Sequence, residues 1–343
     1  MNPMFRTYVA LCLLLGMTSC ATAAPRVEFE LLTEAGFPLA GHQPWLKLLQ
    51  SVGVRNIRIS KASRGDRPAI DNVGSADAPS YRVTGLLRVG NKLQLEGGTF
   101  RATDQAGLAR WLEKLQDDGI ASLTEPTGPF GLSAKRLVAV SEALAKPLAF
   151  STKDKPCYQT AVKIAQGLTL KFQVDPVAKR LLKSDEVFTD ELQGLSSGTA
   201  LAAVIRPLGL VLVPHREQGQ EMHLRIVRSG DAKESWPIGW PPQHSPGKTL
   251  PDLFRSLNVE IDDTPLPDAL AAIKQRVNVP FLFDYNSMAR QQIEPEKINV
   301  TLPRKKSFYN SIVRDLLRQA KLKHELRVDD AGKPFLWIAS LKP

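Results

Sequence analysis

Cysteine is scarce in this chain of 343 residues, which has only Cys12, Cys20 and Cys157. Two of the three lie near the N-terminus, so the remainder of the chain has one cysteine and cannot form an internal disulfide. This excludes a disulfide-stapled scaffold, and we expect the domains to depend on packed apolar cores. Cys157 stands at the start of a segment with helical apolar spacing, which predicts a small buried side chain rather than a reactive thiol.

Long apolar runs are also absent. The longest, Tyr8–Met17, has ten residues, whereas a membrane-spanning helix needs about 20. It follows Arg6 and precedes small residues, which is the order of a secretory signal. We therefore predict that residues 1–23 are a signal peptide and that the protein is exported to the periplasm or the cell envelope.

Two processing routes remain open for this leader. Cleavage can follow Ala21-Thr22-Ala23, as in simple secretion. Alternatively, Met17-Thr18-Ser19-Cys20 resembles the lipobox of bacterial lipoproteins, in which Cys20 would be lipidated. We expect contact with a membrane only in the second case.

Low-complexity and fibrous classes are excluded by composition, since 43% of residues are hydrophobic, 23% are charged and only 7% are aromatic. The length favours two or three domains. Proline and glycine concentrate in Leu123–Gly131 and Trp236–Gly247, as they do in linkers. We predict modules at residues 25–123, 132–235 and 248–343, with 236–247 as a linker.

The C-terminal module has the clearest pattern. Leu257–Ile261 alternates as a strand, and apolar residues from Leu266 to Val277 recur at helical spacing. Ser307 is predicted to cap a second helix. The full expected order is β-α-β-β-α-β-β, with further strands at residues 280–285, 298–302, 324–328 and 335–339.

The middle module repeats that order. It has expected strands at residues 147–151, 170–175, 187–192, 210–214 and 222–227, and helices at 157–165 and 199–206. Phe172–Asp175 aligns with Phe281–Asp284, and Leu224–Ile226 aligns with Leu336–Ile338. The first module shares these elements without a visible alignment, and 61–80 is expected to be an exposed loop. The predicted fold class is thus α+β and multi-domain, with tandem β-α-β-β-α-β-β modules after a separate small α+β module.

In the C-terminal copy, LNVEIDDTPLPDALAAIKQRVNVPFLFDY, INVTLPRKKSFYNSIVRDLLRQAKLKHELRV and FLWIA resemble the secretin and TonB short N-terminal domain family. The resemblance covers about 85 residues of this copy. It rests on an apolar strand, a "PLxDAL" helix and an "LLxxAxL" helix. It implies a small envelope module that mediates assembly or relays contacts between proteins, without catalytic residues.

One motif suggests catalysis. Gly194-Leu195-Ser196-Ser197-Gly198 matches the Gly-x-Ser-x-Gly nucleophile elbow, which would make Ser196 the nucleophile of a secreted serine hydrolase. The competing interpretation is a turn in which Ser196 or Ser197 caps the next helix. We favour the turn, because the repeat already accounts for this stretch.

No metal or cofactor site is predicted. His215 and His223 face each other across an expected hairpin, but no cysteine lies near them in the sequence. Asp175 and Asp284 occupy equivalent places in the two copies. We interpret both as turn formers at strand ends rather than as an acid/base pair.

The net charge of +10 is concentrated near the C-terminus: residues 290–343 hold 12 Lys/Arg and 6 Asp/Glu. A run of such residues is usually a solvated face, but this one is also the candidate binding surface. Its members are Arg304, Lys305, Lys306, Arg314, Arg318 and Lys321.

The expected function is therefore that of an exported, non-catalytic interaction or assembly module of the cell envelope. Its expected partner is an envelope protein with acidic character. A serine hydrolase and a polyanion-binding envelope protein are the alternatives. Nucleic acid is disfavoured because few aromatic residues interleave with the basic ones.

Overall fold

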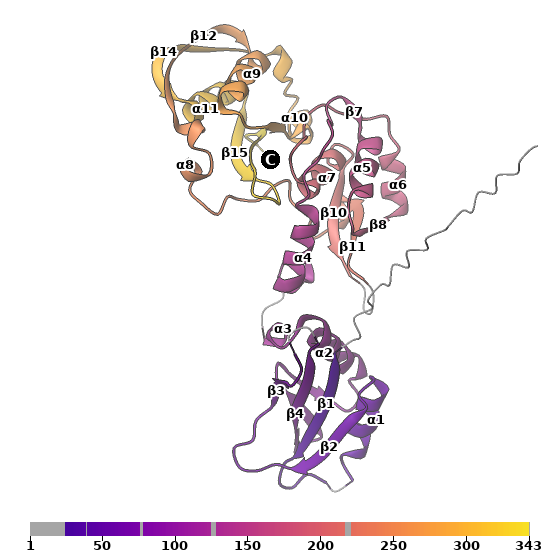
Figure 1. Cartoon of the computed structure of the whole chain (residues 1–343). Coiled ribbons are helices and arrows are strands. Elements are labelled where there is room, and N and C mark those ends of the chain that lie inside the picture. Colours follow the sequence, from indigo (N-terminus) through magenta and orange to yellow (C-terminus); the bar gives the residue numbers. More distant parts are fainter. Residues whose placement is uncertain (1–24, 39, 76–77, 125–127, 217–220, 343) are drawn as a thin grey trace, which may run out of the picture. The chain divides into compact units, whose positions relative to one another are not determined.

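The computed structural model describes residues 25–38, 40–75, 78–124, 128–216 and 221–342 (Figure 1). The chain has the predicted multi-domain α+β fold and divides into two compact units, Met1–Thr124 and Glu125–Pro343. Unit 2 contains both predicted copies. The predicted signal peptide, with Cys20, lies outside the described residues. None of the helices in the described ranges has the length and apolar character needed to cross a membrane.

Unit 1 is built on one mixed sheet with the strand order β2-β1-β4-β5-β6, to which β3 adds beside β4. Phe29, Trp45 and Trp111 are buried in its core. The elements are β1 (Arg26–Thr33), α1 (Gln43–Ser51), β2 (Asn56–Lys61), β3 (Ala69–Asn72), β4 (Ser80–Arg88), β5 (Lys92–Leu95), β6 (Gly98–Arg101), α2 (Gln105–Asp118) and α3 (Ala121–Thr124).

The expected loop at 61–80 contains one of these strands, so that prediction is wrong. Strand β3 pairs with β4 in antiparallel fashion and buries Ile70. A strand of four residues with one buried apolar side chain is too short to show a period of two in the sequence.

The first copy in unit 2 follows η1 (Pro129–Gly131) and α4 (Ala134–Leu144). The first copy comprises β7 (Lys155–Pro156), α5 (Cys157–Gln166), β8 (Lys171–Val174), α6 (Pro176–Leu182), β9 (Val187–Phe188), α7 (Ser197–Ile205), β10 (Leu210–His215) and β11 (His223–Arg228). The segment η2 (Ser229–Asp231) then leads toward the second copy.

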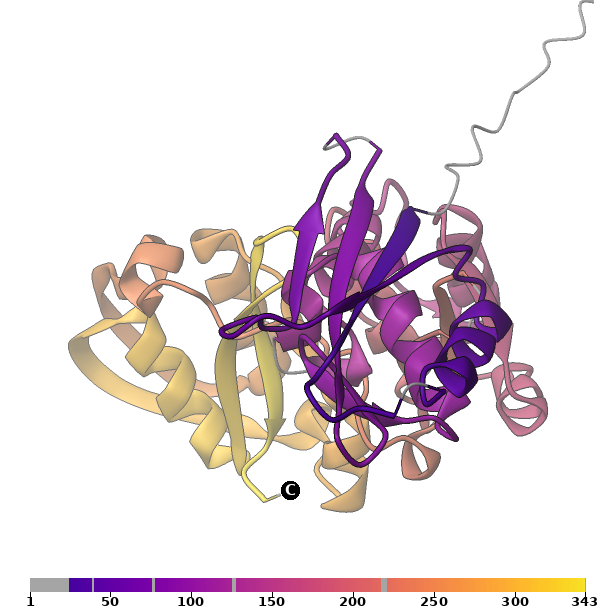
Figure 2. The same ribbon diagram turned by 90° about the horizontal axis from the view of Figure 1, so that it is seen from below.

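The second copy begins after α8 (Pro246–Thr249) and η3 (Pro251–Phe254). The second copy comprises β12 (Ser256–Pro265), α9 (Leu266–Val277), β13 (Phe281–Phe283), α10 (Tyr285–Arg290), η4 (Pro295–Lys297), β14 (Asn299–Phe308), α11 (Tyr309–Gln319), β15 (Leu322–Val328) and β16 (Pro334–Ser340). Strands β15 and β16 lie side by side as an antiparallel pair, and β16 leads to the C-terminus (Figure 2).

The two copies share one topology. Each has a three-stranded sheet, β10-β11-β8 or β13-β16-β15, and a two-stranded sheet, β7-β9 or β12-β14. In the parallel pairs Phe172 lies opposite Leu224 and Phe281 lies opposite Leu336, which matches the sequence alignment. The predicted order lacked the short helix after the central strand, which is α6 in one copy and α10 in the other.

Two local predictions in unit 2 are wrong. Residues 147–151 were expected as the first strand, but only Pro147 pairs, in an isolated bridge with Ser196, and the first strand is β7. Ser307 lies within β14 and does not cap α11, which begins at Tyr309 without a side-chain cap. The long pairing of β14 with β12 carries this segment past the predicted cap.

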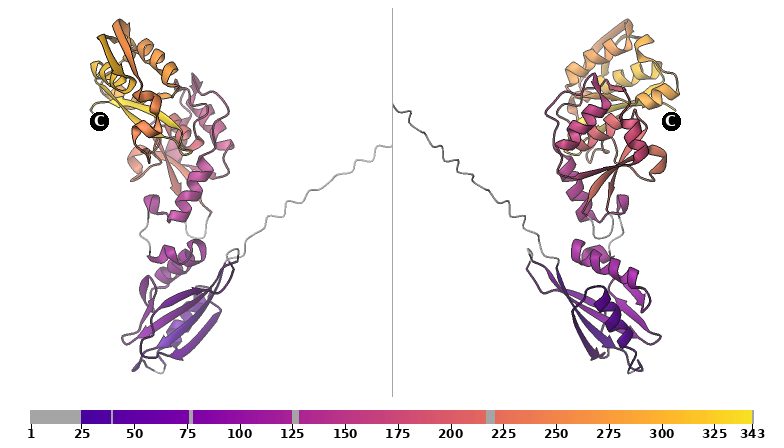
Figure 3. Two further views of the ribbon diagram at one scale, coloured as in Figure 1. Left: turned by 60° about the vertical axis from the view of Figure 1, so that its left-hand side comes forward. Right: turned by 90° about the vertical axis from the view of Figure 1, so that its right-hand side faces the viewer.

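The two copies lie against each other in unit 2 (Figure 3). They share one hydrophobic core. Leu282, Phe335 and Trp337 of the second copy lie in the core of the first. Trp236 and Ile238, from the segment expected as a linker, are buried in the same core. The connection between the copies is therefore an integral part of unit 2.

Candidate functional site

Ser196, the candidate nucleophile, is fully buried at the contact between the two copies. Its hydroxyl donates to Asp330 Oδ2 at 2.6 Å and accepts the backbone N–H of Asp330 at 3.1 Å. Its own N–H donates to Asp329 Oδ2 at 2.7 Å. Both aspartates belong to the turn between β15 and β16, so the serine is held by carboxylates of the other copy.

The same turn caps helix α7. Ser196 stands at the N-cap position, as predicted, but its side chain makes no capping hydrogen bond. Instead, the backbone N–H of Thr199 donates to Asp330 Oδ2 at 2.7 Å, and the Thr199 hydroxyl donates to the same oxygen at 3.0 Å. A carboxylate at this place satisfies an orphan N–H and interacts favourably with the helix dipole. The second copy thus caps a helix of the first.

The other oxygen of Asp330 binds two tryptophans. Its Oδ1 accepts the indole N–H of Trp236 at 2.9 Å and that of Trp240 at 3.0 Å. The two rings meet edge to face, with centroids 5.1 Å apart. One carboxylate therefore joins helix α7, the connecting segment and the β15–β16 turn.

The geometry of this contact accounts for both glycines of the Gly-x-Ser-x-Gly motif. Gly194 has φ +81°, in the left-handed region that favours glycine. At Gly198, a Cβ would come within 2.7 Å of Asp330 Oδ2 and 2.8 Å of the Leu144 Cβ. The motif is thus explained by a turn and a close approach between the copies.

A second carboxylate, Asp190, also joins the copies. It follows β9 and accepts the backbone N–H of Phe283 and the hydroxyl of Tyr285, each at 2.9 Å. Burial raises the pKa of Asp190 to about 6, and the hydrogen bonds only partly oppose this. Burial, followed by the charge of Asp190, raises the pKa of Tyr285.

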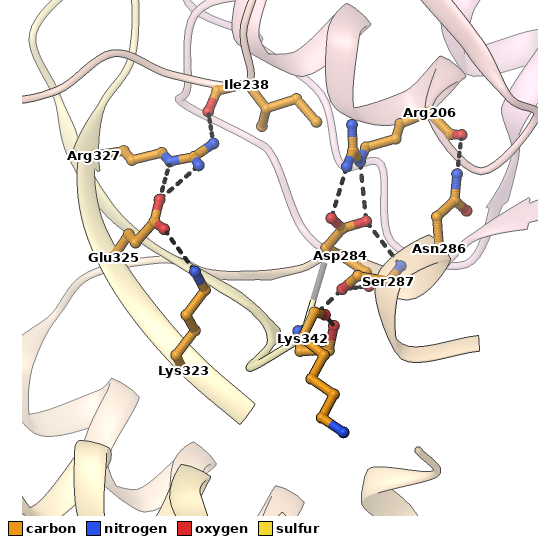
Figure 4. Close-up of polar contacts among 10 residues, drawn as sticks. Arg206, Ile238, Asp284, Asn286, Ser287, Lys323, Glu325, Arg327 and Lys342 are labelled. Atoms are coloured by element: carbon orange, nitrogen blue, oxygen red, sulfur yellow. Dashed lines mark hydrogen bonds and ion pairs between the residues drawn. The ribbon is translucent and has the colours of Figure 1, made fainter. Parts of the chain in front are cut away.

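A cleft of about 470 Å³ lies between the copies. At one side Arg206 Nη2 contacts Asp284 Oδ2 at 2.7 Å and its Nε donates to Oδ1 at 3.0 Å (Figure 4). At the other side Glu325 accepts Arg327 Nη2 at 2.7 Å. Both guanidinium groups lie over the Trp337 ring, 5.8 and 5.3 Å from its centroid. These ion pairs hold the walls of the cleft in place. Asp284 also caps α10 directly after β13, in agreement with its predicted role as a turn former at a strand end.

The predicted basic residues do not form one continuous row. Arg304, Lys305 and Lys306 belong to β14, and Lys305 Nζ pairs with Asp315 Oδ2 at 2.9 Å. Arg314 and Arg318 are exposed on α11, and Lys321 is exposed in the turn after it. Of the six, only Arg314 and Arg318 line the groove described next.

This groove, which we call the α11–β15 groove, has a volume of about 470 Å³. Phe254 and Leu341, among its lining residues, are 37% and 48% exposed. Arg314, Arg318 and Lys323 supply its charges, and none of its lining residues is a carboxylate. Its lining comprises Pro246, Leu253, Phe254, Asn310, Arg314, Arg318, Leu322, Lys323, His324, Leu326 and Leu341. Sequence reasoning missed its apolar half, because Phe254 and Leu341 lie far from α11 in the sequence.

The remaining candidate residues are His215, His223 and Cys157, and their contacts are those of structural residues. His215 and His223 lie opposite each other in the β10–β11 hairpin, as predicted, with ring centroids 5.3 Å apart. Across the described ranges, no group of three or more His, Cys, Asp or Glu is placed to hold a metal ion. Cys157 is buried, as predicted, and burial raises the pKa of its thiol to about 11.

No protein-family model, no curated protein and no solved structure matches this chain. The likeness to secretin and TonB short N-terminal domains therefore stays a prediction from the sequence pattern.

Proposed function

We propose that the protein is an exported, non-catalytic interaction module of the cell envelope, which binds an acidic segment of a partner protein through unit 2. The observation that carries the proposal is the α11–β15 groove, where exposed apolar side chains lie beside three cations and no carboxylate. A segment with both apolar and acidic residues would satisfy both parts of this surface.

The absence of catalysis in this proposal is supported by the surroundings of Ser196. A serine nucleophile requires a hydroxyl that the substrate can reach and a neighbouring base, most often an imidazole, that takes its proton. The Ser196 hydroxyl is buried, donates to Asp330 and accepts from the same residue. Its exposure would require separation of the two copies.

The architecture of unit 2 supports a binding role in a second way. The copies share a core and are joined by the contacts of Asp190, Arg206 and Asp330. The groove therefore lies on a rigid, preorganised part of unit 2. Preorganisation lowers the entropic cost of binding. The proposed relation to secretin and TonB short N-terminal domains points to the same class of role.

Charge reversal tests the proposal. We expect the triple variant Arg314→Glu, Arg318→Glu, Lys321→Glu to lose the partner while its melting temperature stays the same, because these side chains are exposed. We call it the groove triple variant, since Arg314 and Arg318 line the groove and Lys321 precedes the lining residue Leu322. The matched control reverses Lys179, Arg180 and Lys183, which are three exposed cations on and just after α6.

The measurement is site-specific photocrosslinking in the native envelope, with a benzophenone amino acid at Phe254, followed by mass spectrometry. The control position is Val138 on α4, which is 56% exposed. We expect a protein adduct at Phe254 that the groove triple variant removes and the α6 triple variant keeps. An adduct of equal yield at Val138, or one unaffected by the groove triple variant, would contradict the proposal. Labelling of Ser196 by a fluorophosphonate probe would favour the hydrolase.

A further inference from the structure

Strand β15 has an open edge. It pairs with β16 on one side only, at the end of the β13-β16-β15 sheet. The backbone N–H and C=O of Val328 point away from β16, because they bond to Trp240 at 2.9 and 2.7 Å. Backbone groups alternate in direction along a strand, so those of Leu326 and His324 also point away from β16. Within the described residues these groups have no hydrogen-bond partner.

The chain itself begins a further strand on this edge and then stops. Trp240 forms an antiparallel bridge with Val328, but Pro241 and Pro242 follow it. Proline has no N–H to donate, so the pairing cannot continue along β15. The edge from Leu326 back to Leu322 is therefore left open by the sequence.

This open stretch borders the α11–β15 groove. Leu322, Lys323, His324 and Leu326 line the groove, whereas Glu325 does not. The side chains of Leu322, His324 and Leu326 share one face of the strand, and Lys323 and Glu325 alternate with them along it. The groove, about 470 Å³, lies within the usual range of ligand sites. Five residues of open edge correspond to about 17 Å of added strand.

We propose that the partner segment adds to the open edge of β15 as an antiparallel strand. The inference rests on the proposed function, since it gives the binding mode of the same groove. Cross-strand neighbours lie on the same face, so residues opposite Leu326, His324 and Leu322 enter the groove and should be apolar. The residue opposite Lys323 should be acidic, and the residue opposite Glu325 should be neutral. The occupant is thus an extended segment of the type Val-Thr-Val-Glu-Val-Glu, whose last carboxylate lies near Lys321.

Backbone methylation provides the test, because it leaves the protein unchanged. The probe is the fluorescein-labelled peptide Val-Thr-Val-Glu-Val-Glu, titrated with the full chain and followed by fluorescence anisotropy. In the proposed register the first two Val residues, opposite Leu326 and His324, donate their N–H groups to β15. The N–H groups of Thr and the first Glu point away from it.

Methylation of the first two Val nitrogens should weaken binding by roughly tenfold or more, since two backbone hydrogen bonds are lost. Methylation of the Thr and first Glu nitrogens should change affinity by less than about twofold. The charge-reversed peptide Val-Thr-Val-Lys-Val-Lys should bind more weakly, and affinity for the parent peptide should fall as salt rises.

Equal effects of the two methylation patterns would overturn strand addition. If the groove triple variant still lost the photocrosslinked partner, the proposed function would stand without this binding mode. Failure of the parent peptide to bind at about 1 mM would also overturn the inference, as would binding of heparin or anionic vesicles in its place.

Discussion

Asp330 is the residue on which the contact between the two copies most depends. Its carboxylate accepts five hydrogen bonds, from Ser196, from the backbone and hydroxyl of Thr199, and from the indoles of Trp236 and Trp240. The substitution Asp330→Ala removes all five acceptor contacts at once. It leaves the two indole N–H groups and the backbone N–H of Thr199, near the start of α7, without these partners.

The expected cost follows from these contacts. Removal of this half-buried carboxylate should lower the free energy of unfolding by about 3–5 kcal/mol. Each buried donor that is left unpaired contributes about 1–3 kcal/mol, and these contributions are not additive. Unit 2 has roughly 220 residues, for which 1 kcal/mol shifts the melting temperature by about 2–4 °C. We therefore expect a decrease of about 6–20 °C in the melting temperature of unit 2.

Differential scanning calorimetry of the full chain measures this effect. Unit 1 contains none of the contacts of Asp330, so its transition serves as an internal reference. The matched control is Asp262→Ala, at an exposed aspartate of β12. A shift of less than about 2 °C for Asp330→Ala, or an equal shift for Asp262→Ala, would refute the role of Asp330.

Three further outcomes are expected. Burial raises the pKa of Asp190 in the folded state to about 6 from 3.8. Between these two pH values the folded state binds more protons than the unfolded state, so this group lowers the free energy of unfolding of unit 2 as pH rises from about 4 to about 6. The excess stability of Asp190→Asn over wild type should thus grow by up to about 3 kcal/mol across that range in urea titrations, and a constant difference would contradict the shift. Gly239→Ala should lower the free energy of unfolding by about 2–4 kcal/mol, since Gly239 has φ +69° and an added Cβ would come within 2.4 Å of the Phe335 ring. The control Gly230→Ala, at a position with open space around it, should lower it by less than about 1 kcal/mol. Cys157 should react with a maleimide only upon unfolding, because it is buried and its thiol pKa is raised to about 11; rapid labelling of the native protein would show an open pocket.

The sequence was most informative where an element is long and half buried. The apolar spacing from Leu266 to Val277 predicts α9 with its observed bounds, because one face of that helix packs against the core of the second copy. The aligned strands were predicted because equivalent positions in both copies meet the same sheet. The short helices α6 and α10 were missed, since six or seven residues give less than two full turns of periodicity.

The contacts between the copies could not be predicted from local patterns. Asp330 lies 134 residues from Ser196, and an Asp-Asp turn is ordinarily a solvated hairpin end. Trp236 and Trp240 stand among prolines, which suggested a linker although their indoles bond to Asp330. The Gly-x-Ser-x-Gly motif offered an enzyme as an alternative for a related reason. A Cβ at Gly198 would clash with Asp330, which is distant in the sequence, so local reasoning could not find this structural explanation of the glycine.

The cap that Asp330 provides to α7 has a consequence for how the chain is made. During synthesis the residues of α7 emerge long before Asp330, which follows Thr199 by 131 residues. Until then the backbone N–H of Thr199 lacks its capping carboxylate, and Ser196 lacks its hydrogen-bond partners in the second copy. The first copy therefore reaches its final stability only after the β15–β16 turn has been translated and has packed against it.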